Sequence, residues 1–196
     1  MSKRLFDIAL TLLALPLVLP VLAAAALWIK LDSPGPVLFL QERVGRGGKL
    51  FRIHKLRTMR LHDGRGPLVT QAGDARITRA GRWLRRTKLD ELPQLWDVLR
   101  GAMSLVGPRP EVPRYIALYP PDVRERILSV RPGITGRASI EFRDEERLLS
   151  AAADPEQAYV DQVLPIKQRH DLDYVASHSV VGDVRILLDT LKAVWG

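Results

Sequence analysis

IALTLLALPLVLPVLAAAALWI, residues 8–29, runs for 22 positions without a charged side chain. As a straight helix, a stretch of this length would cross a hydrocarbon core about 30 Å thick. Its unusual feature is a pair of prolines, Pro16 and Pro20, placed one turn apart near its middle. Each proline removes a backbone donor and clashes with the preceding turn, so a sharp kink is expected. The sequence therefore predicts a bent, membrane-inserted helix at the start of the fold.

The charges that flank this segment bear on its path through the membrane. Lys3 and Arg4 precede it and Lys30 follows it, so the positive-inside rule selects no orientation. Basic residues at both ends suit a re-entrant segment, which enters and leaves on the same cytoplasmic face. A plain spanning helix stays open as the alternative, because spanning helices tolerate proline.

Basic side chains are concentrated in one block of the chain. Residues 41–88 hold 14 Lys and Arg against 3 Asp and Glu, whereas residues 89–196 hold 13 against 17. Such a block indicates an anionic partner, which could be nucleic acid, an anionic membrane surface or a phosphorylated substrate. The 196 residues suffice for one substantial core. The sequence contains no cysteine, which excludes disulfides and thiolate catalysis.

The segment after the apolar stretch has the pattern of a hairpin followed by a loop. Residues 33–59, SPGPVLFLQERVGRGGKLFRIHKLRTM, place apolar stretches on either side of three glycines and predict a β-hairpin. Residues 61–76 are rich in glycine, show no apolar periodicity and predict a loop. Helical spacing resumes at about Ile77.

The C-terminal third is predicted to be helical. Asp154-Pro155 is typical of a helix start, and the helix should run to about Val175. Ser179 is the expected cap of a last amphipathic helix, whose apolar face suits either the core or a membrane interface. The charged run 143–147 is interpreted as the solvated start of a helix.

Two adjacent carboxylates, Asp90 and Glu91, lie in TKLDELPQL, residues 87–95, directly after the basic block. Apolar residues surround them, and Pro93 suits the first turn of a helix, so the pair is expected at a junction of helices. One carboxylate could attack phosphorus to form an acyl phosphate, while the other helps to hold a divalent metal. The alternative is structural, with Asp90 as a helix cap and Glu91 as a solvated surface residue.

A proline-flanked arginine favours the chemical interpretation of the acid pair. In Gly107-Pro108-Arg109-Pro110 the prolines fix the local backbone, so the guanidinium of Arg109 would project from a stiff turn. Forked arginine donors match phosphate oxygens well. The sequence therefore predicts a site for phosphoryl chemistry.

Four stretches, taken in order, resemble the bacterial sugar transferases, which are membrane-bound polyprenol-phosphate phosphoglycosyl transferases of the monotopic kind. They are the proline-kinked segment with RLFD before it, SPGPVLFLQERVGRGGKLFRIHKLRTM, LDELPQLWDVLRGAMSLVGPRP and RPGITG. They extend over about residues 3–136, with a weaker echo in DLDYV and the final helix. Their order and length make the resemblance specific, and the chain looks like a minimal catalytic form of the family.

The resemblance implies transfer of a sugar 1-phosphate from a UDP-sugar to undecaprenyl phosphate, with release of UMP and initiation of a surface glycan. The enzyme would be a Mg²⁺-dependent phosphoglycosyl transferase of the bacterial inner membrane, with its catalytic domain on the cytoplasmic face. Its expected partners are UDP-sugar, undecaprenyl phosphate and membrane lipids, without nucleic acid. Pairing of two copies into a homodimer stays open.

The resemblance also implies roles for individual residues. Asp90 matches the family's nucleophile, which forms a covalent phosphosugar intermediate, and Glu91 matches its neighbour in the acidic dyad. Both acids are expected at the Mg²⁺ ion, with Asp90 as its contact in the family. Pro20 matches the helix-breaking proline of a re-entrant membrane helix. The implied substrate-binding residues are Arg85, Arg109, Lys55 and Asp171.

The chain departs from the common family pattern after RPGITG. Many members read RPGITGWAQV, whereas this chain reads RPGITGRASI followed by EFRDEERLL, so Arg137 replaces an aromatic residue. The sugar and the glycan pathway therefore do not follow from the resemblance.

The expected fold is mixed α/β and mainly helical. A re-entrant helix over residues 1–30 would precede a cytoplasmic-face catalytic domain over residues 31–196, with a small β-hairpin and amphipathic interfacial helices. The alternative function is a membrane-anchored basic module that binds anionic lipid or nucleic acid without catalysis. It would explain the apolar segment and the basic block, but neither the acid pair nor the proline-flanked arginine, and no nucleic-acid motif supports it.

Overall fold

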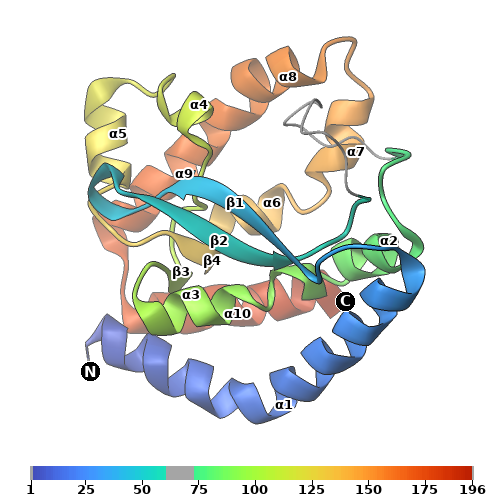
Figure 1. The fold of residues 1–196 in the computed structure, drawn as a ribbon. Coiled ribbons are helices and arrows are strands. Elements are labelled where there is room, and N and C mark those ends of the chain that lie inside the picture. The colour runs from blue at the N-terminus through green and yellow to red at the C-terminus, as the bar shows by residue number, and fades with distance from the viewer. Residues whose placement is uncertain (1, 61–72, 196) are drawn as a thin grey trace.

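The computed structural model describes residues 2–60 and 73–195, and most of them are helical (Figure 1). The α-helices are α1 (Lys3–Asp32), α2 (Arg79–Arg86), α3 (Gln94–Arg100), α4 (Pro113–Ile116), α5 (Pro121–Ile127), α6 (Arg137–Glu141), α7 (Glu145–Ser150), α8 (Pro155–Ala158), α9 (Leu164–Ser177) and α10 (Val180–Trp195). The strands and single turns are β1 (Leu38–Val44), β2 (Leu50–Leu56), β3 (Ser104–Val106), β4 (Gly133–Thr135), η1 (Arg46–Gly48), η2 (Leu89–Glu91) and η3 (Tyr159–Val163). The prediction of a mixed α/β, mainly helical fold is confirmed. Most of the predicted loop over 61–76 lies outside the described residues.

Helix α1 is continuous and bends near its middle, as Figure 1 shows. Its many leucines and alanines favour a helix, and the Ser2 side chain caps it by accepting a hydrogen bond from the backbone three residues on. Pro16 and Pro20 lie inside the helix, which accounts for the bend. Within the part of the chain that the structure describes, α1 alone is long and apolar enough to cross a membrane. The apolar middle of α1 is not covered by the rest of the protein, since Leu13 and Leu17 are 77% and 76% exposed.

Both ends of α1 are fastened to the same body of the protein. At the N-terminal end, Lys3 Nζ donates to Asp183 Oδ2 at 2.6 Å, and Arg4 donates to two carbonyl oxygens of α3 at 2.6 and 3.0 Å. At the C-terminal end, Asp32 Oδ2 accepts a hydrogen bond from Ala80 N at 2.9 Å, at the start of α2. The bend therefore leaves the two ends docked and the apolar middle open.

Strands β1 and β2 form the predicted antiparallel hairpin, with Leu38 opposite Leu56. Gly47 and Gly48 make the connection at φ values of +66° and +76°, which glycine adopts without a Cβ clash. Just beyond β2, the buried guanidinium of Arg57 donates to three carbonyl oxygens and a hydroxyl in residues 33–36. This arginine ties the hairpin to the segment that leaves α1.

Two glycines bring the GPRP and RPGITG turns together. Strands β3 and β4 pair in parallel, Gly107 N donates to Thr135 O at 3.0 Å, and Gly133 N donates to Pro108 O at 2.8 Å. A Cβ on Gly133 would lie 2.1 Å from the backbone nitrogen of Gly107, so a side chain does not fit. This close approach fixes the proline-flanked turn relative to β4.

The predicted helix from Asp154 to about Val175 forms, but it is not a regular α-helix throughout. Asp154 Oδ1 caps its start by accepting hydrogen bonds from two backbone N–H groups at 3.0 Å. Between α8 and α9, the π turn η3 has Leu164 N donating to Tyr159 O, five residues earlier. Pro165 follows and removes the next donor, so the regular ladder cannot pass through this point. The prediction of a helix over this range is confirmed, and the π turn within it is a feature that the sequence does not predict.

Helix α10 carries the predicted amphipathic face. Ser179 Oγ caps it by accepting a hydrogen bond from Gly182 N at 3.1 Å. Ile186 is buried in the core, whereas Val181 and Leu191 are 64% and 56% exposed. One side of the helix therefore belongs to the core, and another apolar side lies open, as a membrane-interface helix requires.

We expect Gly133→Ala to destabilise the protein by about 3 kcal/mol, because the added methyl group would overlap the backbone of Gly107. Gly182→Ala is the matched control, since a Cβ there would meet the flexible Ser179 hydroxyl at 3.2 Å and alanine favours a helix. Urea unfolding of both variants in detergent micelles, followed by tryptophan fluorescence, measures the difference. Equal unfolding midpoints for Gly133→Ala and Gly182→Ala would contradict the close approach of Gly133 to the Gly107 backbone.

Candidate active site

Asp90 and Glu91 lie at a junction of helices, as predicted. They belong to η2, and Pro93 directly precedes the first residue of α3. Lys88 adopts a left-handed backbone with φ +56°, which reverses the chain before the acids. Asp90 is 8% exposed, and its Oδ1 is buried without a hydrogen-bond partner among the described residues. Buried polar atoms are rarely left unpaired, so this oxygen indicates a ligand-binding position.

A cavity of about 1250 Å³ opens beside Asp90. Its lining comes from the hairpin, α2 and η2, the proline-flanked turn, the segment from α6 to α7, and α9. The described cations in this lining are Arg43, Lys55, Arg57, Arg60, Arg76, Arg82, Arg85, Arg86, Lys88, Arg109, Arg143, Arg147 and Lys167. The described acids are Asp90, Glu91, Glu111, Asp144, Glu145 and Glu146. Cations are in excess, which suits an anionic ligand.

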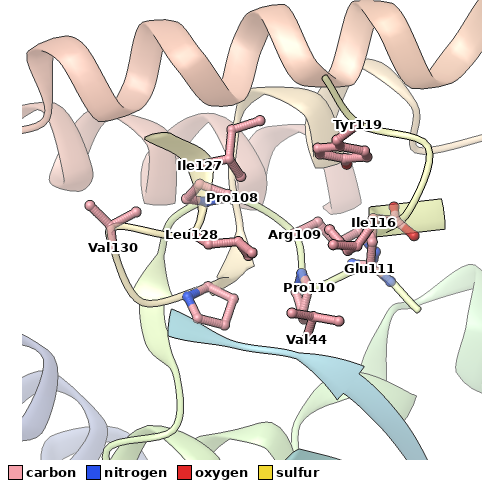
Figure 2. A pocket seen from close by; sticks show the side chains of 11 residues that line it. Val44, Pro108, Arg109, Pro110, Glu111, Ile116, Tyr119, Ile127, Leu128 and Val130 are labelled. Carbon is pink, nitrogen blue, oxygen red and sulfur yellow. The ribbon is translucent and has the colours of Figure 1, made fainter. Parts of the chain in front are cut away.

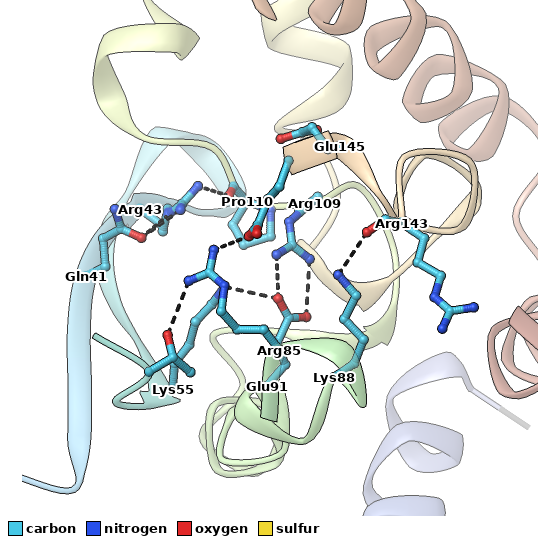
Figure 3. A network of polar contacts seen from close by, with 12 residues as sticks. Gln41, Arg43, Lys55, Arg85, Lys88, Glu91, Arg109, Pro110, Arg143 and Glu145 are labelled. Carbon is cyan, nitrogen blue, oxygen red and sulfur yellow. Dashed lines mark hydrogen bonds and ion pairs between the residues drawn. The ribbon is translucent and has the colours of Figure 1, made fainter. Parts of the chain in front are cut away.

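Glu91 is the centre of an ion cluster, which Figure 3 shows. Arg109 donates to Glu91 Oε1 and Oε2 at 2.5 and 3.2 Å, and Lys55 Nζ donates to Oε1 at 3.0 Å. The cluster joins η2, β2 and the turn after β3, which are far apart in the sequence. Three of the residues singled out in the sequence therefore lie together.

The turn that carries Arg109 is held on several sides. Arg43 donates to Pro110 O at 2.9 Å, and the Pro108 carbonyl is engaged by β4. Figure 2 shows the small apolar pocket beside the two prolines, where Val44 and Leu128 lie close to the turn. Packing and hydrogen bonds together fix the backbone, as the sequence predicts for an arginine between prolines.

The pKa values of the two neighbouring acids are shifted in opposite directions. Burial, reinforced by the negative charge of Glu91, raises the pKa of Asp90 to about 6. Burial acts in the same direction on Glu91, but the charges of Arg109 and Lys55 outweigh it and hold the pKa of Glu91 well below its ordinary value. Glu91 therefore stays ionised, whereas Asp90 gains and loses its proton around pH 6.

Arg85 and Lys88 enter the cavity from the segment before the acids. Arg85 donates to Thr58 Oγ1 at 3.2 Å and forms an ion pair with Glu146, while its buried Nε has no partner within the described residues. Lys88 Nζ donates to Arg143 O at 3.2 Å. Both cations reach across to the segment around α7, as Figure 3 shows.

Asp171 is not among the described residues that line the cavity. It lies on α9 and is 6% exposed, and burial followed by the charge of Glu111 raises its pKa well above the ordinary value. Lys167, one turn earlier, faces the cavity instead. Asp171 is therefore not brought together with Asp90, and Pro16 and Pro20 of the membrane segment also lie apart from the cavity.

The sequence does not predict that residues 143–147 and Glu111 line the cavity. Residues 143–147 do contain a helix start, because α7 begins at Glu145, but the segment is more than a solvated surface, since Glu145 pairs with Lys167 and the segment lines the cavity. Glu111, two positions after Arg109, accepts a hydrogen bond from Tyr159 Oη at 2.7 Å. Its nearness to the proline-flanked turn is the one sequence feature that could have pointed to it.

Asp90 Oδ1 is free to bind a metal ion. Mg²⁺ is commonly held by one or two carboxylates together with water and substrate phosphates. The described ranges 2–60 and 73–195 contain no cluster of three metal-binding side chains. Both oxygens of Glu91 already accept hydrogen bonds from Arg109 and Lys55, so a metal there would compete with two cations. The residues thus fit a Mg²⁺ held by Asp90 and a substrate phosphate, and the expected role of Glu91 at the metal stays a prediction.

Comparison with known proteins gives one consistent family. The family model described as "Bacterial sugar transferase" matches residues 1–196. The chain is 39% identical to the UDP-N-acetylgalactosamine-undecaprenyl-phosphate N-acetylgalactosaminephosphotransferase of Aeromonas hydrophila, over 98% of this chain and 43% of that protein. It is 41% identical to the UDP-glucose:undecaprenyl-phosphate glucose-1-phosphate transferase of Caulobacter vibrioides, over 99% of this chain and 70% of that protein.

A third relative is similar in length to this chain. The exopolysaccharide production protein PSS of Rhizobium leguminosarum bv. phaseoli is 43% identical, over 96% of this chain and 92% of that protein. The chain spans less than half of the Aeromonas relative. Proteins named for two different sugars are similar to it at nearly the same identity, so identity alone does not select a sugar.

We expect the Asp90 carboxyl group to titrate with a midpoint at about 6 in metal-free buffer, well above an ordinary aspartate. Added Mg²⁺ should lower that midpoint, because a bound cation favours the ionised form. Carboxyl ¹³C NMR of protein labelled at aspartate measures both, with Asp90→Asn to assign the signal. A metal-free midpoint near 4 would contradict the buried environment, and a midpoint insensitive to Mg²⁺ would exclude Asp90 as a ligand.

Proposed function

Because the chain belongs to the bacterial sugar transferase family, we propose that it transfers a sugar 1-phosphate from a UDP-sugar to undecaprenyl phosphate. The observation that carries this proposal is the buried, unpartnered Oδ1 of Asp90 beside a cationic cavity. A carboxylate in such a position can act as a nucleophile toward phosphorus. The product would be the first lipid-linked intermediate of a surface glycan.

The first step is attack by Asp90 on the phosphorus that bears the sugar. A bond forms between a carboxylate oxygen and that phosphorus, and the bond from the phosphorus to the bridging oxygen breaks. UMP leaves with the bridging oxygen and its electron pair, and the sugar phosphate stays on Asp90 as a mixed anhydride. A pKa of about 6 keeps most of the Asp90 carboxyl group ionised and nucleophilic at pH 7.

Arg109 and Lys55 stabilise the phosphate charge in this step. Glu91 holds both of them by hydrogen bonds and so fixes their positions before the substrate arrives. Arg85, with an unpartnered Nε, is the proposed contact to the second phosphate. Mg²⁺, if bound at Asp90, would add charge neutralisation at the phosphate oxygens.

The second step returns Asp90 to its starting state. A phosphate oxygen of undecaprenyl phosphate attacks the phosphorus on Asp90, and the carboxylate leaves. Because UMP departs before the lipid phosphate enters, the two anionic groups can use the same cations in turn. This order predicts ping-pong kinetics.

We place the protein at the bacterial inner membrane with its cavity on the cytoplasmic face. Three features support this location: the exposed apolar middle of α1, the docking of both α1 ends on one body, and the basic residues Lys3, Arg4 and Lys30 around it. The substrate's sugar nucleotide is soluble and the acceptor's tail is in the membrane, so the chemistry belongs at the headgroup level.

We expect Asp90→Asn to reduce UMP release from UDP-sugar at least a thousandfold, because an amide cannot form the aspartyl phosphate. Asp189→Asn is the matched control, since Asp189 pairs with Arg137 on the surface of α10, away from the cavity. The assay measures UMP after mixing enzyme and UDP-sugar with Mg²⁺, first without and then with a polyprenol phosphate. Turnover by Asp90→Asn near the wild-type rate would reject Asp90 as the nucleophile. If the protein is a binding module without chemistry, the wild type will release no UMP either.

If α1 is re-entrant, both of its ends should face the cytoplasmic side of the membrane. The chain has no cysteine, so single cysteines at Ser2, Leu17 and Lys30 can be labelled without background. A membrane-impermeant maleimide should react with Ser2→Cys and Lys30→Cys in inverted vesicles and with neither in spheroplasts, while Leu17→Cys stays protected by lipid. Labelling of the two ends from opposite sides would establish a spanning helix instead.

A further inference from the structure

One part of the cavity wall is not part of the phosphate-binding machinery. This sector, which we call the α6–α9 wall, is lined by Glu111, Tyr115, Ser139, Phe142, Glu145 and Lys167. Unlike the rest of the lining, it is nearly balanced in charge, because its two carboxylates face Lys167 and the neighbouring Arg43. A neutral, polar and aromatic surface is a poor site for a diphosphate and a good one for an uncharged, hydroxyl-rich group.

The interior of the α6–α9 wall is built as a rigid support. Tyr159 Oη donates to Glu111 Oε1 at 2.7 Å, and Lys167 Nζ donates to Tyr159 Oη at 3.3 Å. Lys167 Nζ also lies 4.7 Å from the centre of the Tyr159 ring and 5.8 Å from that of Phe142. The side chains of Glu111 and Lys167 are each 7% exposed. These groups satisfy one another and hold the surface in place.

Two polar groups of the wall remain available to a ligand. The Glu145 side chain is 27% exposed, although it pairs with Lys167. Ser139 Oγ is buried at the cavity lining and has no hydrogen-bond partner among the residues the structure describes. The Ser139 hydroxyl can donate or accept a hydrogen bond and the Glu145 carboxylate can accept one, which are the functions that sugar hydroxyl groups require.

The wall lies close to the reacting groups. Figure 3 shows Glu145 and Glu91 on different sides of Arg109. The charge of Glu91, and less strongly that of Glu145, raises the pKa of Arg109, so both acids act on the same guanidinium. Arg109 and Glu145 line the same cavity, so a substrate whose phosphate is held at Arg109 can place its next substituent toward Glu145.

We propose that Glu145 and Ser139 bind polar substituents of the transferred sugar and decide which UDP-sugar the protein accepts. This inference rests on the proposed function, because it assigns the sugar end of the same substrate. The phosphates occupy the cationic end of the cavity, at Arg109 and Arg85, and the sugar lies against the α6–α9 wall. Phe142 and Glu145 of the wall belong to the EFRDEERLL stretch, where the sequence departs from the common family pattern.

The test compares UMP release from UDP-glucose, UDP-galactose, UDP-N-acetylglucosamine and UDP-N-acetylgalactosamine. For Glu145→Gln and for Ser139→Ala, kcat/KM for the best wild-type donor should fall at least tenfold, whereas that for the poorest detectable donor should change less than threefold. Inhibition by UMP, which lacks the transferred sugar, should keep its wild-type constant. Glu141→Gln is the matched control, because Glu141 lies on the same segment but pairs with the surface residue His170.

The outcomes separate the inference from the function on which it rests. Wild-type protein that releases no UMP from any donor would overturn both. If the wild type is active but Glu145→Gln and Ser139→Ala lower kcat/KM equally for all four donors, the α6–α9 wall has a structural role and the inference fails alone. Weaker inhibition by UMP in these variants would assign the wall to the nucleotide and would also overturn the inference.

Discussion

The cavity is organised by the ion cluster in which Glu91 accepts hydrogen bonds from Arg109 and Lys55. Its members come from three separate segments, and each would be costly to bury without the others. The positions of η2, β2 and the proline-flanked turn therefore depend on one another. The same negative charge adds to burial in raising the pKa of Asp90. The Glu91 carboxylate thus connects the three segments and also raises the pKa of Asp90.

The membrane segment imposes a second constraint on the architecture. A straight helix of this length would carry its two ends to opposite sides of a bilayer. Here the ends are docked on one body through Lys3, Arg4 and Asp32, which the bend at Pro16 and Pro20 makes compatible with a single helix. The local cost is the loss of hydrogen bonds to the carbonyl oxygens one turn before each proline, and the docking of both helix ends offsets it.

Local features were predictable because local chemistry determines them. The hairpin glycines, the Asp154 cap and the proline-flanked turn each act within a few residues, and the structure has all three. The π turn was missed because its cause, Pro165, acts together with the helix before it. Glu145 and Lys167 were missed for another reason: their partners lie more than twenty residues away, and charge alone does not distinguish a solvated acid from one that faces a cavity.

In the proposed two-step transfer, Asp90 has to attack phosphorus first and leave it afterwards. A carboxylate with a strongly lowered pKa is a weak nucleophile, whereas one with a strongly raised pKa is protonated at pH 7 and leaves poorly. A value of about 6 lies between these limits. Burial and Glu91 raise it, while Lys55, Arg85 and Lys88 lower it. The cations proposed to bind phosphate therefore also limit the pKa of the proposed nucleophile, and this double role would explain why an acid pair follows directly after a basic block.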